Sequence, residues 1–259
     1  MSSVKDTLLA NREFGKGSLV GYYPAGYPTL KDSVDALVAM SENGCNILEI
    51  GVPYSDPVMD GLVIQVATEE ARAAGFVLGD LFEVIRQVRA RVDTPLLVMS
   101  YWNPVLRFGV EKFAKEIVAA GAQGMITPDL VPDEASQWLA ASEENELDRV
   151  FLVAPSSSDQ RVADNSDASI GFVYSVSTMG ITGERSKLDG LARELVGRVK
   201  SLSSTPTCVG VGISNAEQVR EVNGYADGAI VGTAFVKAYH EDGLEGLVAK
   251  TKELAAGLG

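Results

Sequence analysis

Short apolar runs rich in Val, Ile and Leu recur along the chain, and each is followed by a loop and then by an amphipathic stretch. The runs are continuous rather than alternating, which is typical of parallel strands that are buried on both faces. Eight runs predict strands: Leu19–Tyr23, Asn46–Ile50, Leu96–Ser100, Gly124–Thr127, Val150–Ala154, Gly171–Val176, Cys208–Val211 and Gly228–Val231.

Helical periodicity fills the intervals between these runs. The predicted helices are Leu30–Glu42, Leu78–Val92, Val110–Ala119, Glu134–Glu144, Leu188–Leu202, Ala216–Val222 and Leu244–Leu254, with extra helices at Val4–Phe14 and Val63–Ala74. Residues 158–167 are weakly patterned and predict no complete helix.

Eight strand–helix units in 259 residues predict an α/β fold of the (β/α)8 class, a TIM barrel with extra helices. A doubly wound sheet is less favoured, because the first run is not followed by the Gly-x-Gly-x-x-Gly motif of a dinucleotide-binding unit. We expect a single barrel domain over residues 1–259.

Composition narrows the function classes. Hydrophobic residues make up 46% of the chain, which predicts a sizeable core. The net charge of −13 disfavours binding to nucleic acid or to an anionic membrane. The apolar runs are too short to span a bilayer, and the first residues lack the apolar stretch of a signal peptide, so we expect a cytoplasmic protein.

Few residues are available for metal or thiol chemistry. Cys45 and Cys208 lie in apolar runs and are interpreted as buried, reduced thiols. His240 is the only histidine and lies near a predicted helix end, where an exposed capping role is expected. No metal site is predicted.

A carboxylate stands in the second apolar run, where Glu49 is surrounded by Ile, Leu and Gly. Catalytic groups of a (β/α)8 barrel lie at the carboxyl ends of its strands, and burial raises the pKa of a carboxyl group. We therefore predict a general acid/base at Glu49. The alternative is a salt bridge to a Lys or Arg elsewhere in the barrel.

Two aspartates follow in the same loop. Asp56 precedes Pro57 and is interpreted as a turn former. Asp60 lies eleven residues after Glu49 on the same face of the barrel, so the two carboxylates could divide acid and base roles, although spacing alone leaves a turn role equally open for Asp60.

A phosphate site is predicted at the end of the chain. The seventh run leads into Gly210-Val-Gly212, and the eighth leads into Gly232-Thr233 at the start of a short extra helix. Glycines allow close approach of a ligand, and a helix N-terminus offers free N–H groups to an anion. Neither loop contains Lys or Arg, so backbone amides and the Thr233 hydroxyl would hold the phosphate.

The loop after the sixth run has glycines at 180 and 183, and we interpret it as a lid, with a merely flexible loop as the alternative. Tyr174 precedes it in the strand. An apolar lining for a flat ring is predicted from residues of types that are more often ordinary core: Tyr22, Ile64, Met99 and Val211.

The segment Leu48–Gly61, which contains Glu49-Ile-Gly-Val-Pro-Tyr-Ser-Asp56-Pro-Val-Met-Asp60, closely resembles the alpha subunit of tryptophan synthase. The resemblance spans nearly the whole chain and includes the stretches Pro24–Pro28, Pro128–Pro132, Gly180–Gly183, Gly210–Ser214 and Gly228–Thr233. It implies a lyase that splits indole-3-glycerol phosphate into indole and glyceraldehyde 3-phosphate.

The resemblance also implies individual roles. Glu49 matches the acid/base, Asp60 the carboxylate that binds the indole nitrogen, and Tyr174 the active-site tyrosine. Thr182 matches the lid threonine that contacts Asp60 on closure. The implied phosphate cradle is Gly183, Gly212, Gly232 and Thr233.

The same resemblance implies a complex of two alpha and two beta subunits. Indole would pass to the beta subunit, which carries pyridoxal phosphate, and this chain would need no cofactor of its own. Asp56 and the region around Pro132 would face that partner.

Three positions depart from the pattern that the resemblance implies. Leu62 stands where Pro is common, which could loosen the Asp60 loop. Thr233 stands where Ser is frequent and keeps the hydroxyl. Tyr22 stands where Phe is frequent and adds a hydroxyl to the indole pocket.

Two other functions remain open from sequence alone. A sugar-phosphate isomerase or epimerase could share the phosphate loops, but no Lys or His ends a strand here. A poorly active subunit that mainly activates a partner is the second alternative.

Overall fold

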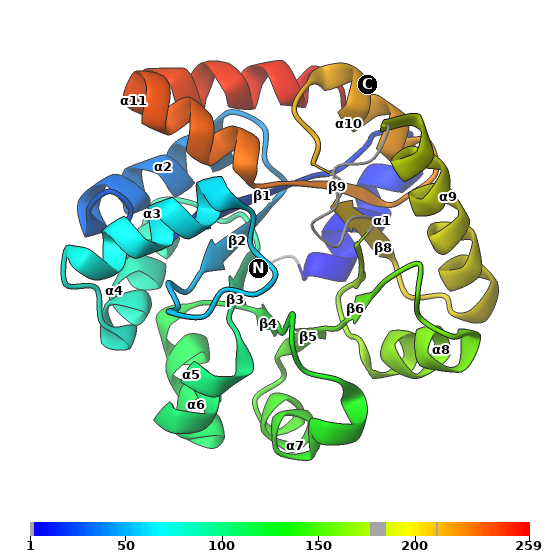
Figure 1. Cartoon of the computed structure of the whole chain (residues 1–259), viewed down its shortest axis with the longest axis horizontal. Helices are drawn as coiled ribbons and strands as arrows, with labels where there is room; N and C mark the ends of the chain where they lie inside the picture. Colours follow the sequence, from blue (N-terminus) through cyan, green and yellow to red (C-terminus); the bar gives the residue numbers. More distant parts are fainter. Residues whose placement is uncertain (1–2, 177–184, 211) are drawn as a thin grey trace.

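The strands form one parallel sheet that curves into a ring, with helices around its outside (Figure 1). The computed structural model describes residues 3–176, 185–210 and 212–259, without the side chains of 185–189. The strands are β1 (Leu19–Pro24), β2 (Ile47–Gly51), β3 (Leu96–Met99), β4 (Gly124–Ile126), β5 (Asp148–Val150), β6 (Leu152–Val153), β7 (Val173–Val176), β8 (Thr207–Gly210) and β9 (Gly228–Val231).

The order of the sheet is β5-β4-β3-β2-β1-β9-β8-β7-β6, and each neighbouring pair is parallel. Its two end strands, β5 and β6, are separated only by Phe151. They are therefore two halves of one barrel strand, and the predicted (β/α)8 fold is confirmed. The predicted continuous strand Val150–Ala154 is wrong in detail, because the break at Phe151 divides it.

The helices match most of the predicted intervals. They are α1 (Val4–Glu13), α2 (Leu30–Glu42), α3 (Leu62–Ala73), α4 (Leu78–Arg89), α5 (Trp102–Phe108), α6 (Val110–Ala120), α7 (Ser136–Glu144), α8 (Asp159–Ala168), α9 (Arg185–Leu202), α10 (Ala216–Asn223) and α11 (Thr233–Ala255), with a 3-10 turn η1 at Pro132–Glu134.

Two helices differ from the sequence prediction. α5 was not predicted, and its Pro104 lies in the first turn, where the missing N–H has no partner to lose. α8 is a regular helix despite its weak apolar pattern, because the Ser158 hydroxyl caps it by accepting the Arg161 N–H at 3.2 Å.

α11 contains both the predicted short helix and the predicted terminal helix. Non-helical angles at Asp242 and Gly243 mark the kink between them. His240 lies just before this kink and is exposed, as predicted, and its Nδ1 is 3.2 Å from the Tyr27 hydroxyl. Cys45 and Cys208 are buried free thiols, also as predicted.

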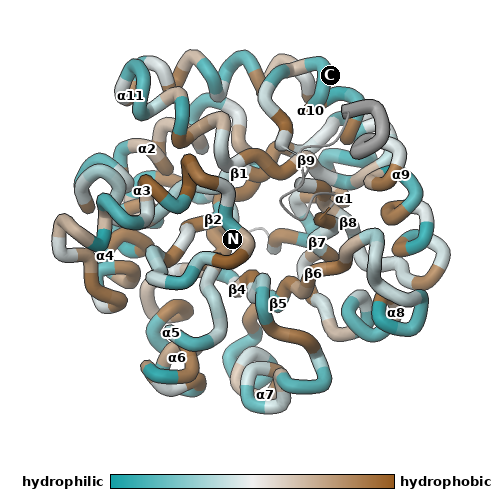
Figure 2. The backbone as a smooth tube through the Cα atoms, in the orientation of Figure 1, coloured by the Kyte–Doolittle hydropathy of each residue, from teal (hydrophilic) through white to brown (hydrophobic). Residues whose placement is uncertain are grey.

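Hydrophobic residues concentrate on the strands and the helix faces against them, whereas hydrophilic residues lie on the outer turns (Figure 2). The larger cluster fills the space between sheet and helices. A second cluster fills the barrel interior and consists of Val4, Leu8, Val20, Ile47, Leu97, Ile126, Val150, Phe172, Cys208 and Ile230. Because Val4 and Leu8 belong to α1, this helix closes the end of the barrel where the strands begin.

The Leu8 side chain provides a test of this closure. Leu8 is fully buried beside Gly228, whereas its neighbour Leu9 is 39% exposed. We expect Leu8→Ala to lower the free energy of unfolding by about 2–5 kcal/mol, since it leaves a cavity in the interior cluster. Urea unfolding measures the loss, and Leu9→Ala is the matched control. Equal losses in the two variants would contradict the closing role of Leu8.

Candidate active site

The carboxyl ends of the strands form the open end of the barrel, which we call the mouth. Tyr22 of β1 lies beside Glu49 of β2 in the sheet register. The Asp60 loop connects β2 to α3, and Tyr174 lies on β7, where it packs against the interior cluster. The topology thus brings the predicted polar residues to one end of the barrel.

Glu49 is fully buried, and neither carboxyl oxygen has a hydrogen-bond partner in the described part of the chain. No Lys or Arg in the described ranges forms an ion pair with it, so the salt-bridge alternative is wrong for these residues. Burial raises the pKa of Glu49 to about 8. Glu49 is the one carboxyl group among the described residues with both oxygens buried and unpartnered, as expected of a group kept for a ligand or for proton transfer.

Asp60 occupies a more polar position. Its backbone is held by the Gln65 side chain, which donates to the Asp60 carbonyl at 2.7 Å. Burial raises the pKa of Asp60 to about 6, and a hydrogen bond from the Tyr101 hydroxyl acts in the opposite direction. Near neutral pH, Asp60 is therefore mostly ionised while Glu49 is mostly protonated, and the two carboxyl groups can take different roles.

Two tyrosines extend across the mouth over glycines. The Tyr22 hydroxyl fills the space that a Cβ of Gly51 would occupy, and its ring passes over Gly232. The Tyr174 hydroxyl lies 2.7 Å from the position of a Cβ on Gly210. Any larger residue at Gly51 or Gly210 would collide with these rings.

The carboxyl groups at the mouth affect the pKa of both tyrosines. Burial raises the pKa of Tyr22 and of Tyr174, and the carboxylates of Glu49 and Asp60 raise each of them further. Both hydroxyls therefore stay protonated at working pH and can donate hydrogen bonds beside the two carboxyl groups.

The predicted phosphate residues lie on the β9 side of the mouth. Thr233 is exposed at the first position of α11, and Gly232 precedes it. The N–H groups of Phe235 and Val236 both donate to the Gly232 carbonyl, at 3.0 and 3.2 Å, which leaves the first N–H groups of the helix for an external acceptor. Gly212 has a φ of +70°, and no atom of the described residues lies within 4 Å of a Cβ built on it.

The other predicted residues differ in burial. Ile64 is buried on α3 in the same cluster as Tyr22, whereas Leu62, at the start of that helix, is 78% exposed. Asp56 is exposed and accepts a hydrogen bond from the Ser55 hydroxyl at 2.6 Å. Three predicted residues, Thr182, Gly183 and Val211, lie outside the described residues.

Sequence reasoning missed Tyr101, which is buried at the mouth directly after β3. It also missed the link to Asp129, whose Oδ1 accepts the Trp102 N–H at 2.8 Å. The available signal was position, since an aromatic residue with a hydroxyl follows an apolar strand at the catalytic end of a barrel.

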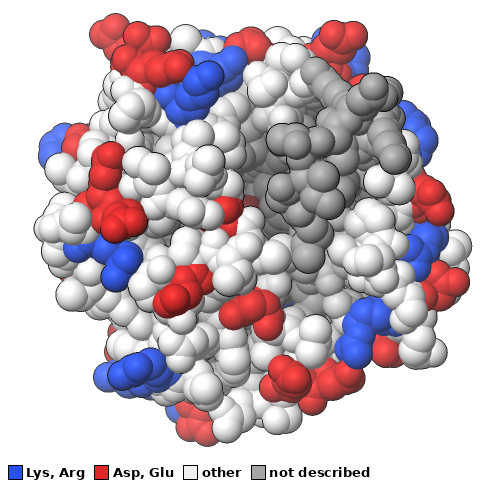
Figure 3. All heavy atoms as spheres, in the orientation of Figure 1, with Lys and Arg blue, Asp and Glu red and all other residues white. Residues whose placement is uncertain are grey.

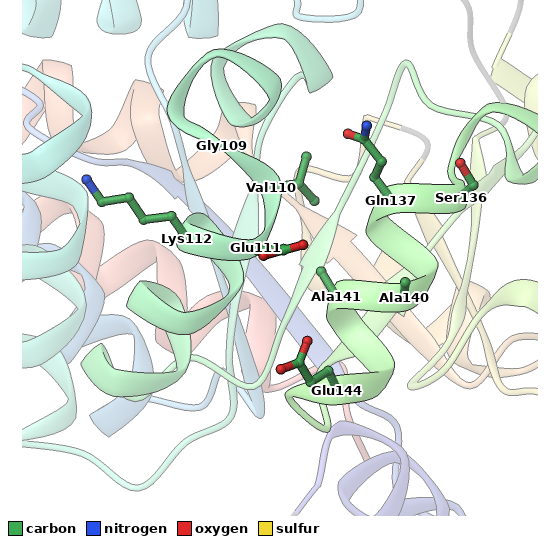
Figure 4. A pocket seen from close by; sticks show the side chains of 9 residues that line it. All are labelled: Gly109, Val110, Glu111, Lys112, Ser136, Gln137, Ala140, Ala141 and Glu144. Carbon is green, nitrogen blue, oxygen red and sulfur yellow. The ribbon is translucent and has the colours of Figure 1, made fainter.

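A separate groove of about 630 Å³ lies between α6 and α7 (Figure 4). It is lined by Gly109, Val110, Glu111, Lys112, Ser136, Gln137, Ala140, Ala141 and Glu144. None of the predicted site residues lines it, so it plays no part in the candidate active site.

Around the mouth, acidic and basic side chains are interspersed, and no broad basic patch is visible among the drawn residues (Figure 3). The described residues contain no cluster of three or more His, Cys, Asp or Glu that could hold a metal ion. None of the helices in the described ranges has the length and apolarity to cross a membrane.

The chain matches the family model "Tryptophan synthase alpha chain" over residues 9–258. It is 54% identical to the tryptophan synthase alpha chain of Leifsonia xyli subsp. xyli over 257 residues, which cover 99% of this chain and 98% of the relative. It is 53% identical to that of Mycobacterium intracellulare over 95% of this chain and 91% of the relative.

Solved structures agree with these relatives. A chain of M. tuberculosis tryptophan synthase in its aminoacrylate-bound form superimposes with a TM-score of 0.92 at 47% identity, covering 100% of both chains. A mutant alpha-subunit from Pyrococcus furiosus gives 0.84 at 33% identity, covering 93% of this chain and 98% of the other.

Proposed function

The chain belongs to the tryptophan synthase alpha chain family, and we propose that it is the lyase of that enzyme, cleaving indole-3-glycerol phosphate to indole and glyceraldehyde 3-phosphate. The observation that supports this most directly is Glu49 at the mouth of the barrel, a fully buried carboxyl group whose two oxygens have no hydrogen-bond partner among the described residues. Retro-aldol cleavage needs such a group, because it moves protons to and from carbon and oxygen inside one site.

The proposed chemistry divides between the two carboxyl groups. The indole ring must gain a proton at C3, and the side-chain hydroxyl must lose one as the carbon–carbon bond breaks and a carbonyl forms. Glu49, protonated near neutral pH, is suited to give and take these protons. Asp60, ionised near neutral pH, is suited to bind the ring N–H and to stabilise the positive charge that develops on the ring.

The remaining residues bind the substrate in this proposal. Tyr174 donates a hydrogen bond near Glu49, and Tyr22 and Ile64 pack on the indole ring. Gly212, Gly232 and Thr233 hold the phosphate through backbone N–H groups and one hydroxyl. Three further residues take the roles that the resemblance and the sequence imply. Thr182 contacts Asp60 when the loop closes, Gly183 binds the phosphate, and Val211 lines the pocket of the ring.

We further propose that the chain works in a complex of two alpha and two beta subunits, with pyridoxal phosphate in the beta subunit and no cofactor in this chain. Two exposed apolar side chains, Val58 of the β2–α3 loop at 79% and Leu62 at the start of α3 at 78%, support a protein partner on this side of the mouth. Two buried free thiols suit a reducing compartment, which supports the cytoplasm.

Release of indole from indole-3-glycerol phosphate, measured with and without the beta subunit, tests the proposal. Activity that rises when the partner is added supports a lyase subunit of an assembled enzyme. High activity in the isolated chain would favour a free-standing lyase, and no indole under either condition would leave only a partner-activating role.

A further inference from the structure

The segment that follows β3 contacts the β2–α3 loop at the mouth of the barrel. The Tyr101 hydroxyl accepts the Met59 N–H at 2.9 Å. Its ring packs on Tyr54 with the ring centroids 5.4 Å apart, and the Asn103 side chain donates to the Tyr54 hydroxyl at 3.0 Å. The β2–α3 loop is therefore held at two points, one next to Asp60 and one away from it.

The Tyr101 hydroxyl still has its own proton to donate. A phenolic hydroxyl is one donor and an acceptor, and the Met59 contact uses only the acceptor. Asp60 directly follows Met59 in the loop, and the Tyr101 hydroxyl lowers the pKa of its carboxyl group, so this carboxylate is the acceptor to which the free donor is best assigned. Because Tyr101 is only 5% exposed, water competes weakly for this hydrogen bond.

The backbone of Tyr101 is itself fixed from the neighbouring strand. Asp129, which follows β4, accepts the Trp102 N–H at 2.8 Å and so fixes the first turn of α5. Tyr101 is thus held through its backbone by the start of α5 and through its ring by Tyr54, so its side chain has little freedom to move away from Asp60.

We propose that Tyr101 is a positioning residue for Asp60: its hydroxyl bridges the Met59 N–H and the Asp60 carboxylate, and this bridge fixes the carboxylate where it faces the ring of the substrate. The expected effect on catalysis rests on the proposed function. The bridge itself can be tested without substrate.

Tyr101→Phe keeps the ring and removes only the hydroxyl. We expect kcat for indole release to fall about 10–100-fold with KM changed by less than about threefold, since substrate contacts remain. The hydrogen bond favours the ionised form of Asp60, so its loss should raise the pKa of Asp60 by about one unit and move the acid limb of the pH–rate profile upward.

The matched control is Tyr54→Phe, which removes the other hydrogen bond between the same segments without touching Asp60. We expect it to leave the titration of Asp60 unchanged. The groups that face Asp60 are Tyr22, Tyr101 and Tyr174, whose hydroxyls do not ionise between about pH 5 and 9, and Glu49 titrates at higher pH than Asp60.

The deciding measurement is carbon-13 NMR of protein labelled at the aspartate carboxyl carbons, with the Asp60 signal assigned from the Asp60→Asn spectrum. An Asp60 titration that is the same in Tyr101→Phe and in the parent overturns the inference. If the parent chain releases no indole, the proposed function fails, while the NMR titration still decides whether Tyr101 holds Asp60. If Tyr101→Phe folds poorly, the double variant Asn103→Ala with Tyr54→Phe serves instead, because it loosens the loop but keeps the Tyr101 hydroxyl. The titration of Asp60 in this variant should stay near that of the parent. A shift of that titration would also overturn the inference.

Discussion

Glu49→Gln is expected to reduce indole release by several orders of magnitude while leaving the fold intact. The amide keeps the shape of the side chain but can neither give nor take the proton that cleavage requires. Steady-state assays with the beta subunit in molar excess measure the loss, and circular dichroism checks the fold. Glu69→Gln, on the exposed face of α3, is the control and should behave like the parent. Near-normal turnover in Glu49→Gln would remove Glu49 from the proposed chemistry.

The same variant should be more stable than the parent at alkaline pH. The folded-state pKa of Glu49, about 8, lies above its ordinary value of 4.5, so the folded chain binds the extra proton between these values. Stability therefore falls as the pH rises from about 4.5 and levels off above about 8, when both states are ionised. Gln stays neutral, and we expect it to gain roughly 2–4 kcal/mol over the parent at pH 8 and nothing at pH 4. Urea unfolding at the two pH values measures this difference.

Asp60→Asn is expected to lower kcat about 10²–10³-fold, because the negative charge opposite the developing positive charge of the ring is lost. The parent should also lose activity as the pH falls through about 6, where Asp60 becomes protonated, and this limb should disappear in the variant. The pH dependence of kcat in the isolated chain measures both effects. Asp56→Asn, an exposed carboxylate of the same loop, is the control.

An Asp60→Asn variant with a parent-like rate would reduce Asp60 to a residue of loop structure. An acid limb retained in that variant would assign the ionisation near pH 6 to another group.

The barrel could be predicted from sequence because buried parallel strands leave a local signal. Each apolar run required only a few consecutive residues, and all eight fall on strands of the sheet. The same rule failed at the fifth strand for two reasons. Its first residues, Asp148 and Arg149, are charged, and its break at Phe151 falls inside an uninterrupted apolar run. α8 was weakly indicated because its stability comes from the Ser158 cap more than from an apolar stripe.

The candidate site was only partly accessible from sequence. Glu49 could be identified because a carboxylate in an apolar strand is unusual on its own. For Tyr101 the sequence offered only its position after an apolar strand. Its relation to Met59 and Asp60 could not be predicted, because they lie forty residues or more before it and meet it only in the fold. The room that Gly51 and Gly210 give to the tyrosine rings is likewise a contact between neighbouring strands, which spacing along the chain cannot indicate.

The closure of the barrel by α1 limits the routes by which a product can leave. With Val4 and Leu8 packed into the interior cluster, the centre of the barrel offers no exit on the side where the strands begin. A small apolar product released beside Glu49 has to depart on the side from which the substrate arrived. Any protein that receives it directly must therefore dock against the rim of that opening.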